Sequence, residues 1–188
     1  MTSIFSAIRS ALRPAVLASA ALLLAGFCLQ AAAVDPPKGW EPRTGDAWVD
    51  RQMEDINLYA ERYRESFIDE LVRYQSAPRD LAQQTLARDW KPGDLYYACA
   101  MAQLIGQPCR NVVAEWDRDH EQGWLDVGKR LGIAPGSAQF AELKRGFVAS
   151  YERWARPLTL DAGLRKAFPN RGKARVADKA AGGKRAGR

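Results

Sequence analysis

The strongest constraint on the fold is a series of apolar residues spaced three or four positions apart between residues 46 and 77. This spacing places them on one face of a single helix of about seven turns. Asp46 can cap the start of that helix, and Pro78 disfavours helical geometry at Ala77 and so ends it. The charges on the opposite face have mixed signs, which favours packing on a helical core over binding along a membrane surface. The apolar series is Val49, Met53, Ile56, Ala60, Tyr63, Phe67, Leu71 and Tyr74.

Shorter helices are predicted after this one, and the predicted fold class is therefore all-α. Proline and glycine separate the helices, and no segment alternates apolar and polar residues long enough to predict a strand. The short connections predict a compact bundle or irregular array of about five to six helices, in one helical domain over residues 45–160. The shorter helices are predicted over residues 76–89, 95–105, 108–120 and 124–131, with a last one capped by Ser137.

Residues 1–33 have the layout of a signal peptide. Arg9 and Arg13 precede a long stretch without charge, and residues 31–33, all alanine, supply the small side chains of a cleavage site. We expect cleavage after this site, a proline-rich leader over residues 34–44, and a periplasmic or secreted protein. No membrane span is expected after cleavage. The alternative is an uncleaved segment that holds the protein in the inner membrane.

The charge of the chain is divided unevenly. Residues 1–33 carry two arginines and no acidic residue, and residues 165–188 carry nine basic residues and one acidic residue. The part between them carries 17 lysines and arginines against 21 aspartates and glutamates. This mildly acidic middle argues against a globular nucleic-acid binder with a basic face.

Residues 161–188 predict a disordered basic tail, because their apolar surface is too small to offset the entropy lost on ordering. We expect this tail to contact an anionic component of the cell envelope or an unknown protein partner, with no specific nucleic-acid partner. The alternative is a solubilising end without a partner. The basic residues assigned to the contact are Arg171, Lys173, Arg175, Lys179, Lys184, Arg185 and Arg188.

Two cysteines remain after the predicted cleavage removes Cys28. Cys99 and Cys109 form an even pair in what should be an oxidising compartment, and the short loop between their helices lets the chain return just far enough to join them. We therefore expect a disulfide between them. The only histidine is His120, which excludes Cys2His2 zinc sites and the HExxH motif. No metal site and no cofactor are expected.

The most distinctive passage is a helix, a glycine stop, a Pro-Gly turn, a serine cap and a second helix over residues 121–144. It resembles a group of uncharacterised small exported helical proteins of Gram-negative bacteria with the pattern G-x-G-W-G, L-G-I-x-P-G-S and F-x-x-L-K. Glu121 and Leu125 stand where that pattern has its flanking glycines. The resemblance implies export and a helical fold, and it implies no activity. The matching residues are Gly123, Trp124, Leu131, Gly132, Ile133, Pro135, Gly136, Ser137, Phe140, Leu143 and Lys144.

The same passage has the outline of a helix-turn-helix, but DNA binding is the weakest of the functional interpretations. A recognition helix needs basic and amide side chains on its leading turn, and residues 138–141 read Ala-Gln-Phe-Ala. The glycines of the passage are better explained as helix stops with positive φ, and Trp124 as a residue that holds the turn on the core.

The sequence contains no arrangement typical of a catalytic site. None of the serines after residue 33 lies in a G-x-S-x-G motif, and Asp117, Asp119 and Glu121 alternate near His120 rather than sharing a helix face. We therefore expect a binding or structural interaction module. The alternative is a periplasmic hydrolase, which would need two carboxylates that converge in a cleft with separated pKa values.

Overall fold

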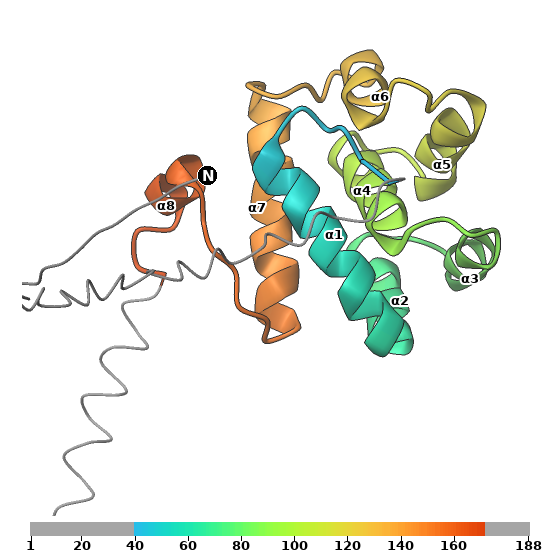
Figure 1. Cartoon of the computed structure of the whole chain (residues 1–188), viewed down its shortest axis with the longest axis horizontal. Helices are drawn as coiled ribbons and strands as arrows, with labels where there is room; N and C mark the ends of the chain where they lie inside the picture. The colour runs from blue at the N-terminus through green and yellow to red at the C-terminus, as the bar shows by residue number, and fades with distance from the viewer. Residues whose placement is uncertain (1–39, 172–188) are drawn as a thin grey trace, which may run out of the picture. The chain divides into compact units, whose positions relative to one another are not determined.

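The computed structural model describes residues 40–171, which form eight α-helices and no strand (Figure 1). The all-α prediction is confirmed for this part of the chain, although the number of helices exceeds the expected five to six. The predicted signal peptide lies outside the described residues, and so do most of the leader and residues 172–188. The helices are α1 (Ala47–Arg62), α2 (Arg64–Tyr74), α3 (Arg79–Ala87), α4 (Pro92–Leu104), α5 (Cys109–Arg118), α6 (Trp124–Arg130), α7 (Ala138–Arg153) and α8 (Ala162–Ala167).

The long helix predicted over residues 46–77 is wrong, because the chain leaves helical geometry at Tyr63 and forms α1 and α2. No glycine or proline marks this break. A straight helix from Ala47 to Tyr74 would be roughly 42 Å long, whereas α4, against which α1 packs, would be roughly 20 Å long. The second half of a straight helix would therefore leave its apolar face without a partner. The break turns α2 against α3, and the apolar residues of the series are buried both before and after Tyr63.

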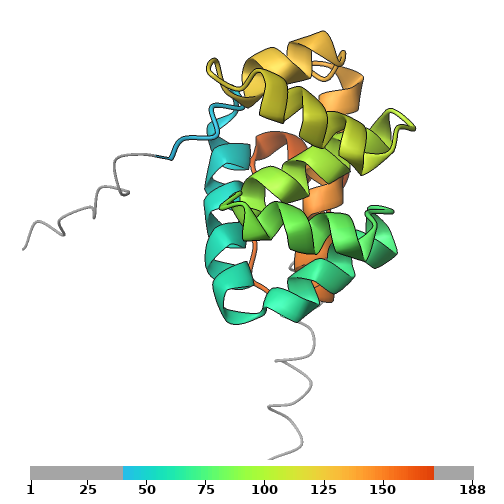
Figure 2. The same cartoon turned by 90° about the vertical axis from the view of Figure 1, so that its right-hand side faces the viewer.

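Helix α4 lies at the centre and contacts α1, α3, α5 and α7 (Figure 2). It is buried on nearly all faces, which explains why its sequence has no clear apolar stripe. Gly93 lets its first turn approach α1, because a Cβ atom there would lie 2.5 Å from the backbone oxygen of Met53. The Gly93 N–H instead donates to Asn57 Oδ1 at 2.7 Å.

Several predicted helix ends are confirmed, and two are wrong. Asp46 caps α1 and Ser137 caps α7 through their side-chain oxygens. Ser76 does not cap α3, since Pro78 occupies the cap position. Gly123 does not stop the preceding helix but begins α6 with φ +79°. Glycine is required there because a Cβ atom would lie 2.7 Å from that of Arg43, in the segment that precedes α1.

The disulfide between Cys99 and Cys109 is present and joins the last turns of α4 to the start of α5. The two Cα atoms are 4.5 Å apart, within the range that disulfides require. Gly106, with φ +67°, ends the helix between them as expected. Both cysteines are buried.

The boundary predicted for the basic tail is wrong, because residues 161–171 are folded. Asp161 caps α8 and, together with Asp46, accepts hydrogen bonds from the Lys144 ammonium. Leu164 is buried, and the Trp48 indole donates to Thr159 O at 2.7 Å, so the segment before α8 is joined to α1. Asp161 and Arg171 pair with Lys144 and Glu152 of α7, partners that the composition of this stretch does not reveal.

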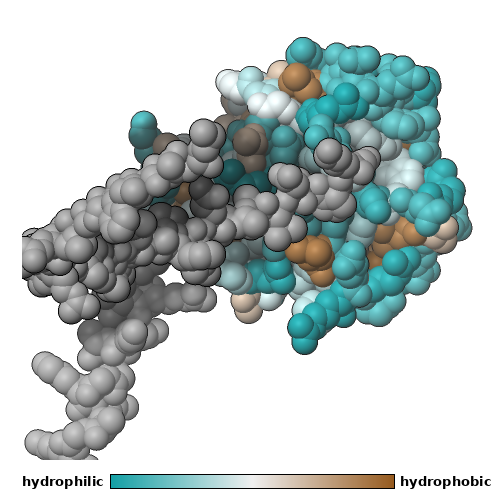
Figure 3. Space-filling model, in the orientation of Figure 1, coloured by the Kyte–Doolittle hydropathy of each residue, from teal (hydrophilic) through white to brown (hydrophobic). Residues whose placement is uncertain are grey.

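The surface of the described residues is largely hydrophilic. On the face drawn in Figure 3, hydrophobic residues form separate patches among hydrophilic ones. The large hydrophobic side chains that are exposed in residues 40–171 are Leu58, Tyr63 and Tyr74. None of the helices within this range is both long and apolar enough to cross a membrane.

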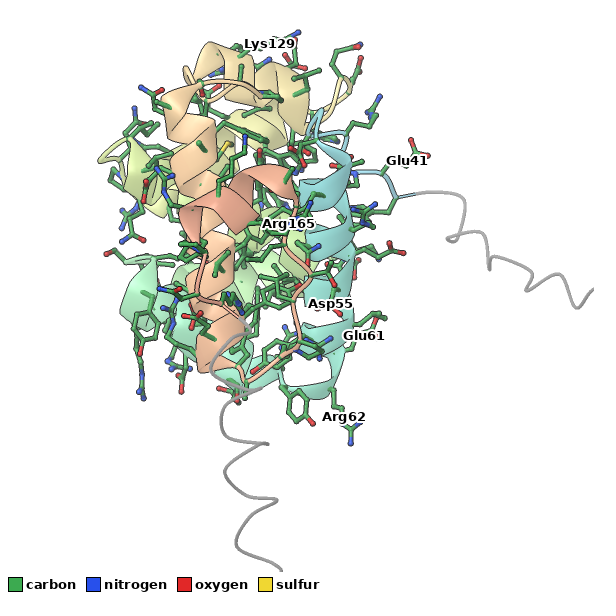
Figure 4. All side chains as sticks on the ribbon, turned by 90° about the vertical axis from the view of Figure 1, so that its left-hand side faces the viewer. Glu41, Asp55, Glu61, Arg62, Lys129 and Arg165 are labelled. Atoms are coloured by element: carbon green, nitrogen blue, oxygen red, sulfur yellow. A yellow bond between two sulfur atoms is a disulfide. The ribbon has the colours of Figure 1, made fainter. Side chains whose placement is uncertain are left out.

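We predict that Lys144→Met lowers the free energy of unfolding by about 2 to 3 kcal/mol, because it leaves Asp46 and Asp161 close together without their shared cation. Lys129 is exposed and forms no ion pair among the described residues, so Lys129→Met serves as the control (Figure 4). Urea denaturation of both variants measures the difference. Equal stabilities would contradict a structural role for Lys144.

Candidate functional site

A cavity of about 440 Å³, which we call the Gln75 cavity, lies between α4 and α7 at the end of α2. It combines aromatic, aliphatic and polar side chains, as ligand-binding cavities in proteins commonly do. Helix α2 and the residue after it contribute Tyr74 and Gln75, and the other two helices form the walls. The wall residues are Tyr96, Ala100, Gln103 and Leu104 from α4, and Glu142, Leu143, Gly146, Ala149, Ser150 and Arg153 from α7.

A buried ion pair lies beside this cavity. The Glu70 side chain is only 3% exposed, and its Oε2 accepts from Arg153 Nε at 2.9 Å. Ser150 Oγ donates to Glu70 Oε1 at 2.7 Å and lies 2.8 Å from the Tyr96 hydroxyl. A carboxylate removed from water needs such partners, since an uncompensated buried charge costs several kcal/mol. The network thus fixes α2, α4 and α7 relative to one another around the cavity.

The protonation states in this network are not poised for proton transfer. The hydrogen bonds to Glu70 raise the pKa of the Arg153 guanidinium above its ordinary value. Burial raises the pKa of the Tyr96 hydroxyl, which therefore stays protonated. Ser150 has no histidine or lysine beside it in the network and donates to a carboxylate already bonded to arginine. These groups can hold a ligand, and they lack an activated nucleophile.

Tyr74 and Arg153 form one edge of the cavity. The Arg153 guanidinium carbon lies 3.8 Å from the centroid of the Tyr74 ring, a cation–π arrangement that orders both side chains. The same two residues line a smaller cavity of about 300 Å³, which Trp154 also lines. Tyr74 is exposed, and about a third of the Arg153 side chain is exposed, so both are accessible from solvent.

Gln75 carries a buried polar atom without a partner. The residue is 6% exposed, and its Oε1 has no hydrogen-bond donor among the described residues. Leaving a buried acceptor unsatisfied costs about 1 to 3 kcal/mol. Gln75 also lines the cavity, so a small movement of its side chain would let a molecule in the cavity supply the missing donor. The indole Nε1 of Trp154, which lines the smaller cavity, is also buried without a partner.

Gly146 lies in the middle of α7 and lines the same cavity. A Cβ atom added there would meet no other atom within 4 Å, so packing does not require glycine. Glycine inside a helix is less favourable than alanine by about 1 kcal/mol. Glycine at this position therefore lowers the stability of α7 and leaves space at the cavity wall.

The distinctive passage of the sequence lies elsewhere in the fold, and among its matching residues only Leu143 lines the cavity. The structure brings its residues together around α6 and the start of α7. Trp124, Ile133, Phe140 and Leu143 are buried in the core, whereas Gly132, Pro135 and Gly136 are exposed in the connection. Leu131 packs against the core, and Lys144 forms the ion pairs described above. The passage thus supports the fold and does not form a site.

Asp94 is a buried carboxylate whose setting the sequence does not reveal. It is 4% exposed and accepts from Trp124 Nε1 at 2.6 Å and from Trp40 Nε1 at 2.8 Å. Burial raises the pKa of Asp94 to about 6, although both indole hydrogen bonds oppose the increase. This carboxylate joins the segment before α1 to α4 and α6. Asp94 does not line the Gln75 cavity.

Other acidic residues are engaged in ion pairs rather than converging in the cavity. Glu142, on the cavity wall, lies 2.6 Å from Arg145 Nη2. Asp117 bonds Arg88, and Asp119 bonds Arg130. No cluster of three metal-binding side chains occurs within residues 40–171. Of the residues assigned to an anionic contact, Arg171 lies 3.1 Å from Glu152, and the others lie outside the described part of the chain.

The chain matches no protein family model, no curated protein and no solved structure. The cavity beside Gln75 combines a buried acceptor, the partly exposed side chain of Arg153 and the aromatic ring of Tyr74. This combination is suited to holding a small polar molecule.

We predict that the protein gains stability as the pH falls from 7 to 5, through Asp94. Its pKa of about 6 in the folded protein exceeds the ordinary 3.8, so protonation favours the folded state. The stabilisation is fully present when the pH is below the ordinary pKa of 3.8. It is lost as the pH rises through the folded-state pKa of about 6. Since one pKa unit corresponds to about 1.4 kcal/mol, the gain between pH 7 and pH 5 is about 1 kcal/mol.

Denaturation of Asp94→Asn at both pH values checks this expectation. The variant should lack the gain, whereas Asp80→Asn, which changes an exposed carboxylate of α3, should keep it. An unchanged pH dependence in Asp94→Asn would show that Asp94 is not the group responsible.

Proposed function

We propose that this chain is an exported binding protein that holds a small polar molecule in the cavity between α2, α4 and α7. The unpartnered Oε1 of Gln75 is the observation that carries the proposal. A ligand that donates a hydrogen bond there would remove a cost of about 1 to 3 kcal/mol that the ligand-free protein bears. Hydroxyl, amide and ammonium groups can all supply that bond.

The electrostatics of the cavity favour a ligand without a strong net negative charge. Arg153 is the one basic residue in the lining, and Glu70 already neutralises it. Glu142 adds an acidic side chain to the same wall. An anion would therefore meet a guanidinium whose charge is largely compensated, whereas a neutral hydroxyl or amide loses nothing by this compensation.

Export is the second half of the proposal. It is supported by the arrangement of charge and small side chains in residues 1–33 and by the disulfide between Cys99 and Cys109. Disulfides persist mainly in oxidising compartments such as the periplasm or the extracellular medium. The basic residues after α8 supply a further contact with an anionic envelope component. Neither the hydrolase nor the DNA-binding interpretation gains a specific observation from residues 40–171.

We predict that Gly146→Leu abolishes ligand binding without unfolding the protein, because leucine can occupy the open space at this point of the cavity wall and replaces a helix-destabilising glycine. The matched control is Gly146→Ala, which should raise the free energy of unfolding by about 0.5 to 1 kcal/mol and keep the ligand.

Native mass spectrometry of protein purified from the exported fraction detects the ligand as an adduct that denaturation removes. The wild-type protein and Gly146→Ala should carry it, and Gly146→Leu should not. The intact mass also reports whether residues 1–33 have been removed. An adduct of equal occupancy in Gly146→Leu would place the ligand elsewhere and overturn the proposed cavity. The export proposal is tested separately, by the intact mass.

A further inference from the structure

A third cavity, of about 700 Å³, lies between the end of α7 and α8. Its lining combines guanidinium groups with apolar side chains. The guanidinium groups come from Arg156, Arg165 and Arg171, and the apolar part includes Leu158, Leu160 and Phe168. We refer to these six residues as the arginine pocket. Arg165 lies on α8 (Figure 4).

The arginine pocket carries one positive charge more than the acidic residues that pair with its arginines. Three arginines face one acidic residue in the lining, Glu152, which pairs with Arg171. Arg156 is bonded to Asp55 of α1. Arg165 is exposed, and its hydrogen bond among the described residues goes to the backbone oxygen of Leu160. Arg165 therefore keeps its charge for an anionic oxygen, and the N–H donors of Arg156 and Arg171 that their ion pairs leave unused can add hydrogen bonds.

The apolar residues distinguish this pocket from a simple anion site. Leu158, Leu160 and Phe168 pack partly against the core and remain partly accessible in the pocket. Free phosphate would use the arginines and leave this apolar surface in water. A molecule with a phosphate joined to hydrocarbon would use both parts, since each buried CH₂ contributes about 0.8 kcal/mol.

The chain continues from the arginine pocket into a strongly basic sequence. After Arg171 it carries six lysines and arginines against the single acidic residue Asp178. Basic residues next to a site of positive charge strengthen the attraction to an anionic lipid surface, which is worth about 1 kcal/mol for each lysine or arginine near the surface. The charge of the sequence and the lining of the pocket therefore favour the same class of partner.

We propose that the arginine pocket binds the headgroup and glycerol end of an acidic phospholipid. The phosphate accepts hydrogen bonds from Arg165 and its neighbours, and the first part of the acyl chains lies on Leu160 and Phe168. This site is separate from the Gln75 cavity, so either proposal can fail without the other.

The test is an NMR titration of the purified protein with dihexanoyl phosphatidylglycerol, kept below its micelle concentration. Dihexanoyl phosphatidylcholine and inorganic phosphate are titrated in parallel. We expect saturable shift changes around Arg165 and Phe168 with phosphatidylglycerol, and affinity at least about tenfold lower for the other two, since they lack either the net charge or the hydrocarbon. Equal responses to the two lipids, or changes confined to residues 172–188, would overturn the proposal.

A pair of arginine variants separates the pocket from general electrostatic attraction. Arg165→Gln should weaken the binding of phosphatidylglycerol about fivefold, whereas Arg145→Gln, which removes an equal charge from the surface of α7, should not. The Trp48 indole N–H signal, which depends on the bond to Thr159, reports whether the segment before α8 stays folded in both. Equal weakening by the two variants, or complete displacement of the lipid by a DNA oligonucleotide, would show a non-specific polyanion surface instead.

Discussion

The ion pair between Glu70 and Arg153 determines how the elements around the Gln75 cavity are arranged. It joins α2 to α7, and Ser150 and Tyr96 extend it to α4. Glu70 can reach this position only because the chain bends at Tyr63, which redirects α2 away from the axis of α1. A buried carboxylate with a full set of hydrogen bonds specifies one arrangement of its helices, since displacement of any partner leaves a charge uncompensated.

Three features that lower stability lie around this arrangement. Gln75 has an unpaired buried acceptor, Trp154 has an unpaired buried donor, and Gly146 weakens α7 without a packing reason. Elsewhere in the described residues Thr85 Oγ1 is also buried without a partner, whereas Lys144 between two carboxylates and Asp94 between two indoles are well paired. Natural proteins depart from local optimisation mainly where function requires it. The coincidence of the three departures at two adjoining cavities is the reason for assigning binding to this part of the molecule.

Local sequence signals predicted local features well. Asp46 and Ser137 were identified as caps because capping depends on a side chain and the next few backbone N–H groups. The disulfide followed from the short connection between two helices. The break at Tyr63 could not be predicted, since it depends on the length of α4 and not on any residue near position 63. The order of α8 was missed for a similar reason, because its partners Lys144 and Trp48 are distant in sequence. The cavity itself depends on residues from three helices, and a glycine inside α7, Gly146, is a local signal that could have indicated it.

The central claim is that the Oε1 of Gln75 receives its hydrogen bond from a ligand. A high-resolution crystal structure of protein purified from the exported fraction tests this claim most directly, provided that the orientation of the amide is assigned from its hydrogen bonds. The account predicts non-protein density in the cavity, with a donor atom within about 3.2 Å of Oε1. Density for ordered water alone, or an amide rotated so that its oxygen accepts from the Tyr96 hydroxyl, would contradict it.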